Sequence, residues 1–221
     1  MEERKETLNH WNRAAYGFGD FGFNLYWSTV GFFILYFYTD VVGLSGTVAG
    51  LIFLVAMLWD SIADPLMGYF AQRTRSRWGC YRPYFLFGAI PLGVSLMLTF
   101  YHPNAQGSAL ILYVLLAHIF FRTAYTVVNI PYSALSAKIT KSTEIRNSLS
   151  AWRISFATIG SALVAYSTLK LVEALGQGDP SKGFFLTAAF YAGLSIPVFF
   201  VLFFTVRDPP PQLALAESTD L

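Results

Sequence analysis

The stretch that decides the fold is residues 83–121, PYFLFGAIPLGVSLMLTFYHPNAQGSALILYVLLAHIFF, which runs for 39 residues without Asp, Glu, Lys or Arg. A helix needs about 20 apolar residues to cross a bilayer, so this stretch can form two spans. The polar segment HPNAQGS at 102–108 predicts the turn between them. On both sides of this turn the apolar residues are continuous and do not alternate with polar ones, which favours membrane helices over barrel strands.

The rest of the sequence has the same composition. Of its 221 residues, 55% are hydrophobic and only 13% are charged, whereas an ordinary soluble domain has about 25% charged residues. This composition excludes a disordered chain and a typical soluble enzyme. The net charge of +2 is too small for a basic face, so we expect no nucleic-acid partner. The single cysteine, Cys80, excludes an intramolecular disulfide framework.

Long neutral runs recur along the chain and predict an all-α membrane protein built as a six-transmembrane-helix bundle. The expected helices lie at about 14–39, 46–71, 83–101, 108–136, 147–173 and 183–206. The expected organisation is a cytoplasmic N-terminus at 1–13, a six-helix bundle at 14–206 and a cytoplasmic linker or free tail at 207–221.

The basic residues predict the orientation in the membrane, because cytoplasmic loops carry an excess of Lys and Arg. Eleven of them flank the expected spans on the side of both chain ends, and two lie on the opposite side. We therefore expect both termini to be cytoplasmic. The first group is Arg4, Lys5, Arg13, Arg73, Arg75, Arg77, Arg82, Lys138, Lys141, Arg146 and Arg207, and the second is Lys170 and Lys182.

Two carboxylates interrupt the second expected span, in the segment WDSIADPLMG. Asp60 and Asp64 are four residues apart, which places them on one helical face with Cβ atoms roughly 5–6 Å apart. Carboxylates this close repel each other, so at least one is expected to bind a proton or a cation such as Na⁺. The alternative is a structural pair that Arg73 or a group on a neighbouring helix neutralises.

Polar side chains form stripes on three of the expected helices. Residues four or seven apart share a helical face, so each stripe points in one direction. Together the stripes predict a water-filled cavity for a polar organic solute, or alternatively hydrogen bonds that join the helices. The stripes consist of Tyr16, Asp20, Asn24, Trp27 and Ser28; of His118, Arg122, Tyr125, Asn129 and Ser133; and of Ser150, Arg153 and Ser161.

The charged members of these stripes have different expected roles. Ionisable groups within spans are costly and usually face a cavity or a partner, so Asp20 and Arg153 are expected to function directly or as a buried pair. His118 is near the outer end of its span, where an interfacial position would explain it. Arg122 either lines the cavity or extends along the helix to the interface.

Motifs of several enzyme classes are absent from the sequence. It contains no phosphate-binding GxxxxGK[ST] loop, no HExxH zinc motif and no Gly-x-Ser-x-Gly elbow. We expect neither an enzyme nor a cofactor, and only a coupling ion in addition to a solute.

Four segments and one arginine resemble a known family in the expected order. They are FYTDVVGLS (37–45), WDSIADPLMG (59–68), RTRSRWGCYRPY (73–84), AYTVVNIPYSAL (124–135) and Arg153. With these segments the chain resembles the N-terminal half of the glycoside–pentoside–hexuronide:cation symporters, the melibiose-permease-like group of the major facilitator superfamily. The resemblance implies one six-helix half of a major facilitator fold.

The resemblance also implies roles for individual residues. It implies that the acid pair and a helix-4 hydroxyl bind the coupling cation, H⁺ or Na⁺, and that other residues line a cavity for a sugar or glycoside-like solute. The cation residues are Asp60, Asp64 and Thr126, and the solute residues are Asn24, Tyr125, Asn129 and Arg153, with Asp20 as a further acid.

Three departures from the melibiose branch refine these expectations. That branch has Asp where this chain has Asn24 and Asn129, which argues against an α-galactoside. It also has an amide where this chain has Ala63, and losing that oxygen favours H⁺ over Na⁺.

The resemblance implies a bacterial inner membrane.

Family members have two six-helix halves, so the partners expected are a small polar solute, membrane lipid and a second half in the same or another chain. The alternatives are a lipid-like solute, or a half-length membrane interaction protein or remnant that does not transport.

Overall fold

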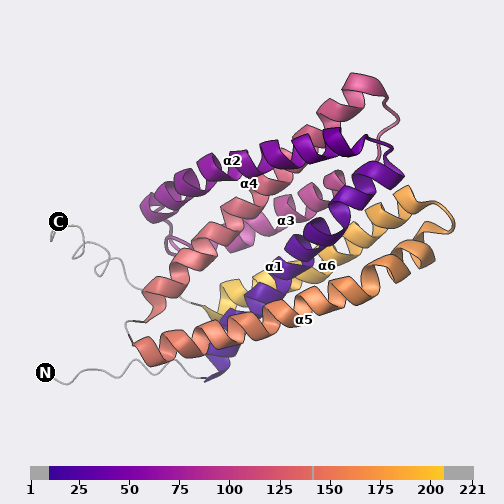
Figure 1. Ribbon diagram of the computed structural model, residues 1–221. Helices are drawn as coiled ribbons and strands as arrows, with labels where there is room; N and C mark the ends of the chain where they lie inside the picture. The colour runs from indigo at the N-terminus through magenta and orange to yellow at the C-terminus, as the bar shows by residue number, and fades with distance from the viewer. Residues whose placement is uncertain (1–9, 141, 207–221) are drawn as a thin grey trace, which may run out of the picture.

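The computed structural model describes residues 10–140 and 142–206. Six long α-helices and one π-helical segment, η1, account for nearly all of these residues (Figure 1). Most of the expected N-terminal segment and all of the expected tail at 207–221 lie outside the described residues. The elements are α1 (His10–Tyr36), η1 (Phe37–Val41), α2 (Gly46–Arg73), α3 (Arg82–Thr99), α4 (Gly107–Ile139), α5 (Thr143–Gly176) and α6 (Pro180–Thr205).

Each expected span coincides with an observed helix, although several helices are longer than expected. α5 begins at Thr143 because Ser142 caps it, its hydroxyl accepting a hydrogen bond from the Ile145 amide. Of the described helices, α2 to α6 are long and apolar enough to cross a membrane, which makes this an integral membrane protein. α1 is not among them, because polar residues and glycines interrupt its apolar side chains.

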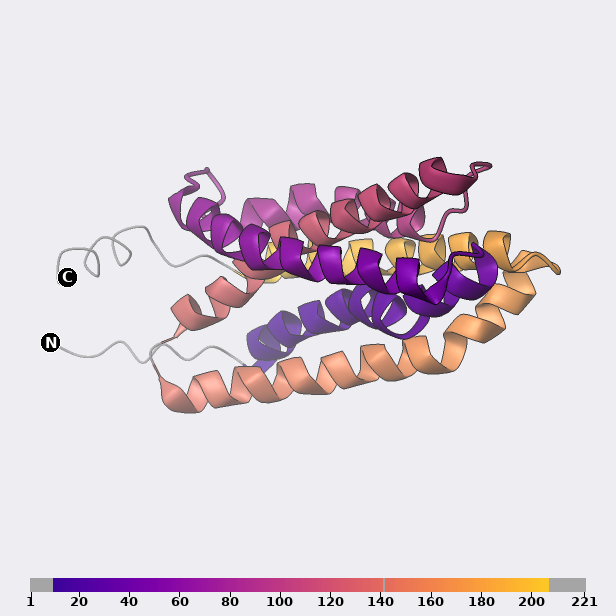
Figure 2. The same cartoon turned by 45° about the horizontal axis from the view of Figure 1, so that its top comes forward.

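The packing of the helices follows an internal pattern of two three-helix units. α1 packs against α5 and α6, while α4 packs against α2 and α3, and α3 also packs against α6. Exchanging α1 with α4, α2 with α5 and α3 with α6 reproduces these pairs, as expected for inverted repeats. The contact between α5 and α6 departs from the pattern, because α2 and α3 have no comparable contact. Figures 1 and 2 show the closest of them, α1 and α5, running side by side along the bundle.

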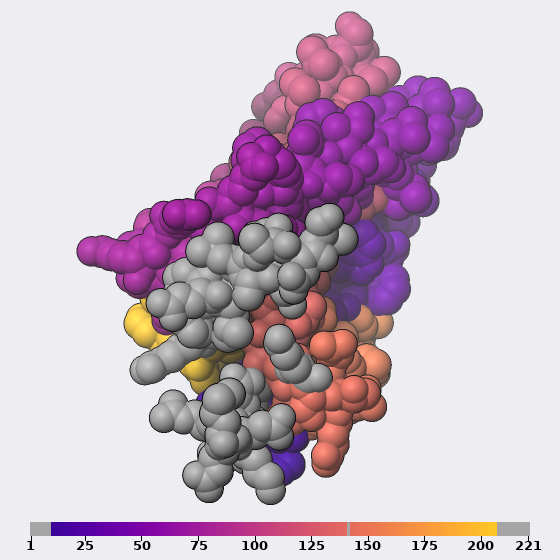
Figure 3. Space-filling view, turned by 90° about the vertical axis from the view of Figure 1, so that its left-hand side faces the viewer, coloured from indigo at the N-terminus to yellow at the C-terminus, as the bar shows by residue number. Residues whose placement is uncertain are grey.

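The two ends of the bundle carry different connections. α1 begins and α6 ends at the same end as the α2–α3 and α4–α5 connections, whereas η1, the α3–α4 connection and the α5–α6 connection lie at the opposite end (Figure 1). We call these the basic end and the opposite end, because the arginines of 73–82 lie at the first. Viewed from the basic end, α2 and α5 are on different sides of the bundle (Figure 3).

Close backbone packing holds α5 against α6 at the opposite end. A Cβ atom added to Gly183 would lie 2.3 Å from the backbone oxygen of Val172, far closer than van der Waals contact. Gly176 faces the same contact, where an added Cβ would lie 3.0 Å from the Cα of Gly183. The absence of side chains at these two positions therefore sets the distance between the helices.

We predict that Gly183→Ala lowers the stability of the bundle by about 1–3 kcal/mol, because the added methyl group meets backbone that cannot move aside. Thermal unfolding in detergent measures the effect. Gly193→Ala is the matched control on the same helix, since a Cβ there meets nothing within 4 Å, and it should leave stability unchanged or slightly raised. Equal melting temperatures for the two variants would contradict the packing argument.

Candidate functional site

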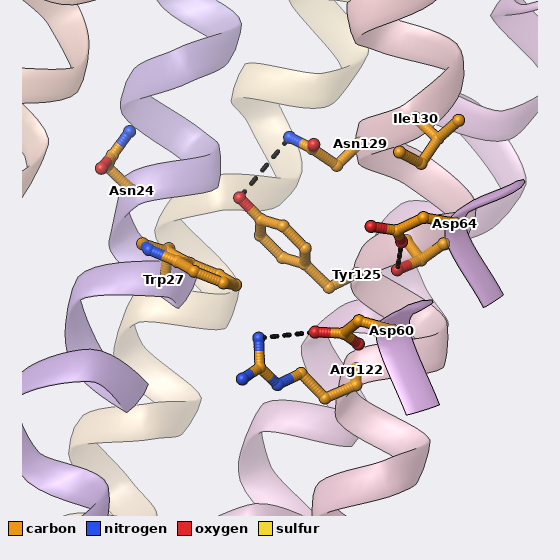
Figure 4. A pocket seen from close by; sticks show the side chains of 9 residues that line it. Asn24, Trp27, Asp60, Asp64, Arg122, Tyr125, Asn129 and Ile130 are labelled. Atoms are coloured by element: carbon orange, nitrogen blue, oxygen red, sulfur yellow. Dashed lines mark hydrogen bonds and ion pairs between the residues drawn. The ribbon is translucent and has the colours of Figure 1, made fainter. Parts of the chain in front are cut away.

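A cavity of about 260 Å³ opens between α1, α2 and α4 (Figure 4), and its lining residues lie near the middle of these helices. Six of the eight residues predicted for the cation and solute sites line it, and the other two, Asp20 and Arg153, do not. The lining consists of Asn24, Trp27, Asp60, Asp64, Arg122, Tyr125, Thr126, Asn129 and Ile130.

Both carboxylates of α2 contact α4. Asp60 Oδ2 lies 2.9 Å from Arg122 Nη1, and Asp64 Oδ1 accepts a hydrogen bond of 2.7 Å from the Thr126 hydroxyl. α2 and α4 run in the same direction, and Asp64 and Thr126 each lie one helical turn beyond Asp60 and Arg122. The two helices therefore bring both pairs into contact in the same way. Of the two alternatives for neutralising Asp60, the neighbouring helix provides the group, and Arg73 does not line the cavity.

Arg122 points into the cavity and does not extend to the interface. Its side chain is 6% exposed, and its guanidinium lies 5.0 Å from the ring centroid of Trp27 and 5.6 Å from that of Phe53. Aromatic rings attract a cation through their negative faces, so α1 and α2 both help to hold the guanidinium beside Asp60. The sequence alone left open whether the Arg122 side chain lines the cavity or extends to the interface.

The rest of the cavity lining includes amides and aromatic rings from α1 and α4. Asn24 uses its amide within the protein, donating 2.9 Å to the backbone oxygen of Asp20 and accepting 3.1 Å from the Ser161 hydroxyl. Asn129 donates to the Tyr125 hydroxyl at 3.5 Å and has further donor and acceptor capacity toward the cavity (Figure 4). Amides beside an aromatic wall suit a solute that carries several hydroxyl groups.

Asp20 and Arg153 form a second ion pair outside the cavity lining, toward the basic end. Arg153 Nε lies 2.6 Å from Asp20 Oδ2 and its Nη2 lies 3.3 Å from Oδ1, while the Tyr132 hydroxyl donates to Oδ2 at 2.6 Å. The cluster therefore joins α1, α4 and α5. Tyr132 was not singled out in the sequence, although it follows Tyr125 by two helical turns and so shares its face.

His118 connects α4 to η1 at the opposite end. Its side chain is fully buried, and Nδ1 lies 3.1 Å from the Tyr38 hydroxyl. The interfacial position that its place near a span end suggested is therefore wrong. The π-helical turn η1, which follows α1, places Tyr38 in the bundle core.

The family is established by comparison with known proteins. The family model described as MFS/sugar transport protein matches residues 15–220. The chain therefore belongs to this family of major facilitator transporters, and the resemblance seen in its motifs is confirmed. A transport family also agrees with the expectation that the chain is not an enzyme.

Three relatives are similar to the chain over most of its length, and two of them are named symporters. It is 39% identical over 89% of its length to YagG of Escherichia coli (strain K12), a candidate glycoside/cation symporter. It is 36% identical over 97% of its length to the inner membrane symporter YicJ of the same strain, and 33% identical over 89% to the isoprimeverose transporter of Lactiplantibacillus pentosus. These matches cover 43%, 48% and 41% of the relatives, so the chain spans less than half of each.

The pair of Asp20 and Arg153 predicts strong coupling between two substitutions. Asp20→Asn leaves a partly buried guanidinium without its carboxylate, and Arg153→Gln leaves the carboxylate without its guanidinium, so each should destabilise the protein. The double variant removes both charges and should be more stable than the two losses added together, by about 0.5–3 kcal/mol. Thermal unfolding of the four proteins measures this, and simple additivity would contradict the pairing.

Proposed function

We propose that the complete polypeptide containing this chain is a cation-coupled secondary symporter of a sugar or glycoside-like solute. This chain then supplies the cation site and half of the solute cavity. The observation that carries the proposal is that the acids of α2 open into the same cavity as the amides of α1 and α4. The cation residues are Asp60, Asp64 and Thr126, and the solute residues in the lining are Asn24, Tyr125 and Asn129.

The geometry supports a direct route for coupling. Thr126, which donates to Asp64, follows Tyr125 in α4 and precedes Asn129 by about one turn. A proton or cation at the acid pair neutralises negative charge and changes what Asp64 accepts from Thr126, so the neighbouring solute residues respond. The linkage is reciprocal: if the cation tightens solute binding, the solute must tighten cation binding by the same factor.

A second six-helix half, in the same or another chain, would cover the open side of the cavity. In the most apolar 18-residue stretch of each helix, only 22% of the residues of α2 and 17% of those of α5 are buried within the bundle. The corresponding share is 44% for α3, α4 and α6. α2 and α5 are equivalent in the internal repeat and lie on different sides of the bundle. We therefore infer that these two helices flank the surface on which the second half docks.

The proposed placement is six spans in a bacterial inner membrane, with both termini cytoplasmic. It is supported by the basic residues at 73–82, which gather at the end where α1 begins and α6 ends. With α1 counted as a sixth span, an even number of spans puts both termini on the same side of the membrane, the side of these basic residues. α1 carries polar residues because it faces the cavity, which accounts for its lower hydropathy.

The polar lining favours a hydroxyl-rich solute over a lipid-like one. Asn24 and Asn129 are neutral, so they suit the hydroxyl groups of a glycoside without adding charge. Because Arg122 already contacts one of the two carboxylates and Ala63 has no side-chain oxygen, few oxygen ligands remain for Na⁺. We therefore propose H⁺ as the coupling ion.

Asp64→Asn should abolish gradient-driven accumulation of the solute in membrane vesicles, while exchange of labelled for unlabelled solute continues at a measurable rate. The substitution removes the charge that the cation neutralises and keeps the shape of the side chain. Asp40→Asn is the control, because Asp40 is exposed on η1 outside the cavity lining, and it should accumulate solute normally. Undiminished accumulation by Asp64→Asn would refute the cation site.

If H⁺ is the coupling ion, an inward pH gradient in vesicles free of Na⁺ should drive uptake of the same solute, and a protonophore should abolish it. A Na⁺ gradient at fixed pH should have no effect in this assay. Stimulation by Na⁺ under those conditions would assign the site to Na⁺ instead.

A further inference from the structure

The described part of the bundle contains two partly buried Asp–Arg pairs of different construction. In the pair near the basic end, two nitrogens of Arg153 contact both oxygens of Asp20, and Tyr132 adds a third contact. Fork-shaped contacts of this kind are strong and geometrically specific. This pair also lies outside the cavity lining, so an ion entering the cavity does not meet it.

The pair in the cavity is joined through a single contact. Arg122 Nη1 meets Asp60 Oδ2, while Asp60 Oδ1 and Arg122 Nε are buried and have no hydrogen-bond partner among the residues described. Buried polar atoms are ordinarily paired, so each of these two atoms is a place where a further partner would be stabilised. The carboxylate is 23% exposed and faces the cavity.

The charges of the cavity lining do not cancel, and the imbalance matches one bound cation. Asp60, Asp64 and Arg122 are the charged members of the described lining, with Tyr125 as a neutral neighbour and buried His118 one turn before Arg122 in α4. With both acids ionised, the guanidinium leaves the site with one net negative charge. That charge matches one monovalent cation or one proton.

We propose that Arg122 is a resident counter-cation that competes with the coupling ion for Asp60. In the unloaded site the guanidinium holds Asp60, supported by the rings of Trp27 and Phe53. When a proton or cation binds the acid pair, the single contact breaks and the guanidinium is released toward the cavity, where the solute binds. Arg122 thus sets the affinity for the ion and limits the site to one ion per cycle. This inference rests on the proposed function and names the regulation of the same site.

The test compares cation binding in the complete native polypeptide and its variants, without any solute. Thermal unfolding in detergent is followed while NaCl replaces choline chloride at fixed pH, and separately across pH in choline chloride. An ion that binds the folded protein raises its melting temperature, so each titration gives a half-saturation point. An opposite charge within about 4–6 Å shifts the affinity of a carboxylate for a proton by roughly tenfold or more.

Arg122→Gln should therefore bind the ion at least about tenfold more tightly than the wild type, as a lower half-saturating NaCl concentration or a midpoint pH about one unit higher. Arg122→Lys retains the charge on a shorter side chain and should shift in the same direction by less. It is also the variant to use if Arg122→Gln does not fold. Arg75→Gln removes one positive charge from an exposed site in the α2–α3 connection and should match the wild type.

A double substitution separates competition for Asp60 from a general change of charge. In Asp60→Asn the remaining ion binding is at Asp64, which Thr126 contacts and Arg122 does not. Adding Arg122→Gln should then change the half-saturation point by less than about threefold, far less than in the wild-type background. Unchanged or weaker ion binding in both Arg122 variants would overturn the proposal, as would an equal effect of Arg122→Gln with and without Asp60. Failure of the symporter function itself would be seen separately, as absent accumulation by the wild type.

Discussion

The constraint on which this bundle depends is the cost of placing charge among apolar side chains. Neither Asp20 nor Asp60 is left alone: Arg153 reaches the first from α5, and Arg122 reaches the second from α4. Because a lone buried charge would cost several kcal/mol, each pair also fixes how its two helices lie against each other. The remaining acid of the cavity lining, Asp64, has no arginine contact of this kind and accepts a hydrogen bond from the Thr126 hydroxyl instead.

The sequence predicts the helices well because bilayer thickness acts on each span separately. The run at 183–206 is apolar enough to be identified without reference to any other helix, and α6 coincides with it to within a few residues. The ends are less predictable, since they depend on local caps such as Ser142 and on polar turns that extend beyond the apolar run. The π-helical turn η1 has no periodic signature and was not predicted.

Some features of the site follow from the spacing of residues along one helix, and others depend on how several helices pack together. The stripe of Arg122, Tyr125 and Asn129 follows from helical spacing alone, and these three residues do line one cavity. Which partner each side chain meets depends on the register between helices, and periodicity contains no information on that register. The direction of Arg122 and the burial of His118 therefore required the three-dimensional arrangement.

α1 and the η1 segment that follows it are each joined to the antiparallel α4 by a tyrosine contact, and this has a mechanical consequence. Toward the basic end, the Tyr16 hydroxyl donates to the backbone oxygen of Tyr132, and toward the opposite end Tyr38 meets His118. The cavity-lining residues of α1 and α4 lie between these two contacts, so the helices cannot separate there without breaking one of them. The part of the wall that α1 and α4 form should therefore move as one rigid unit, and a change in the width of the cavity should occur between this unit and α2.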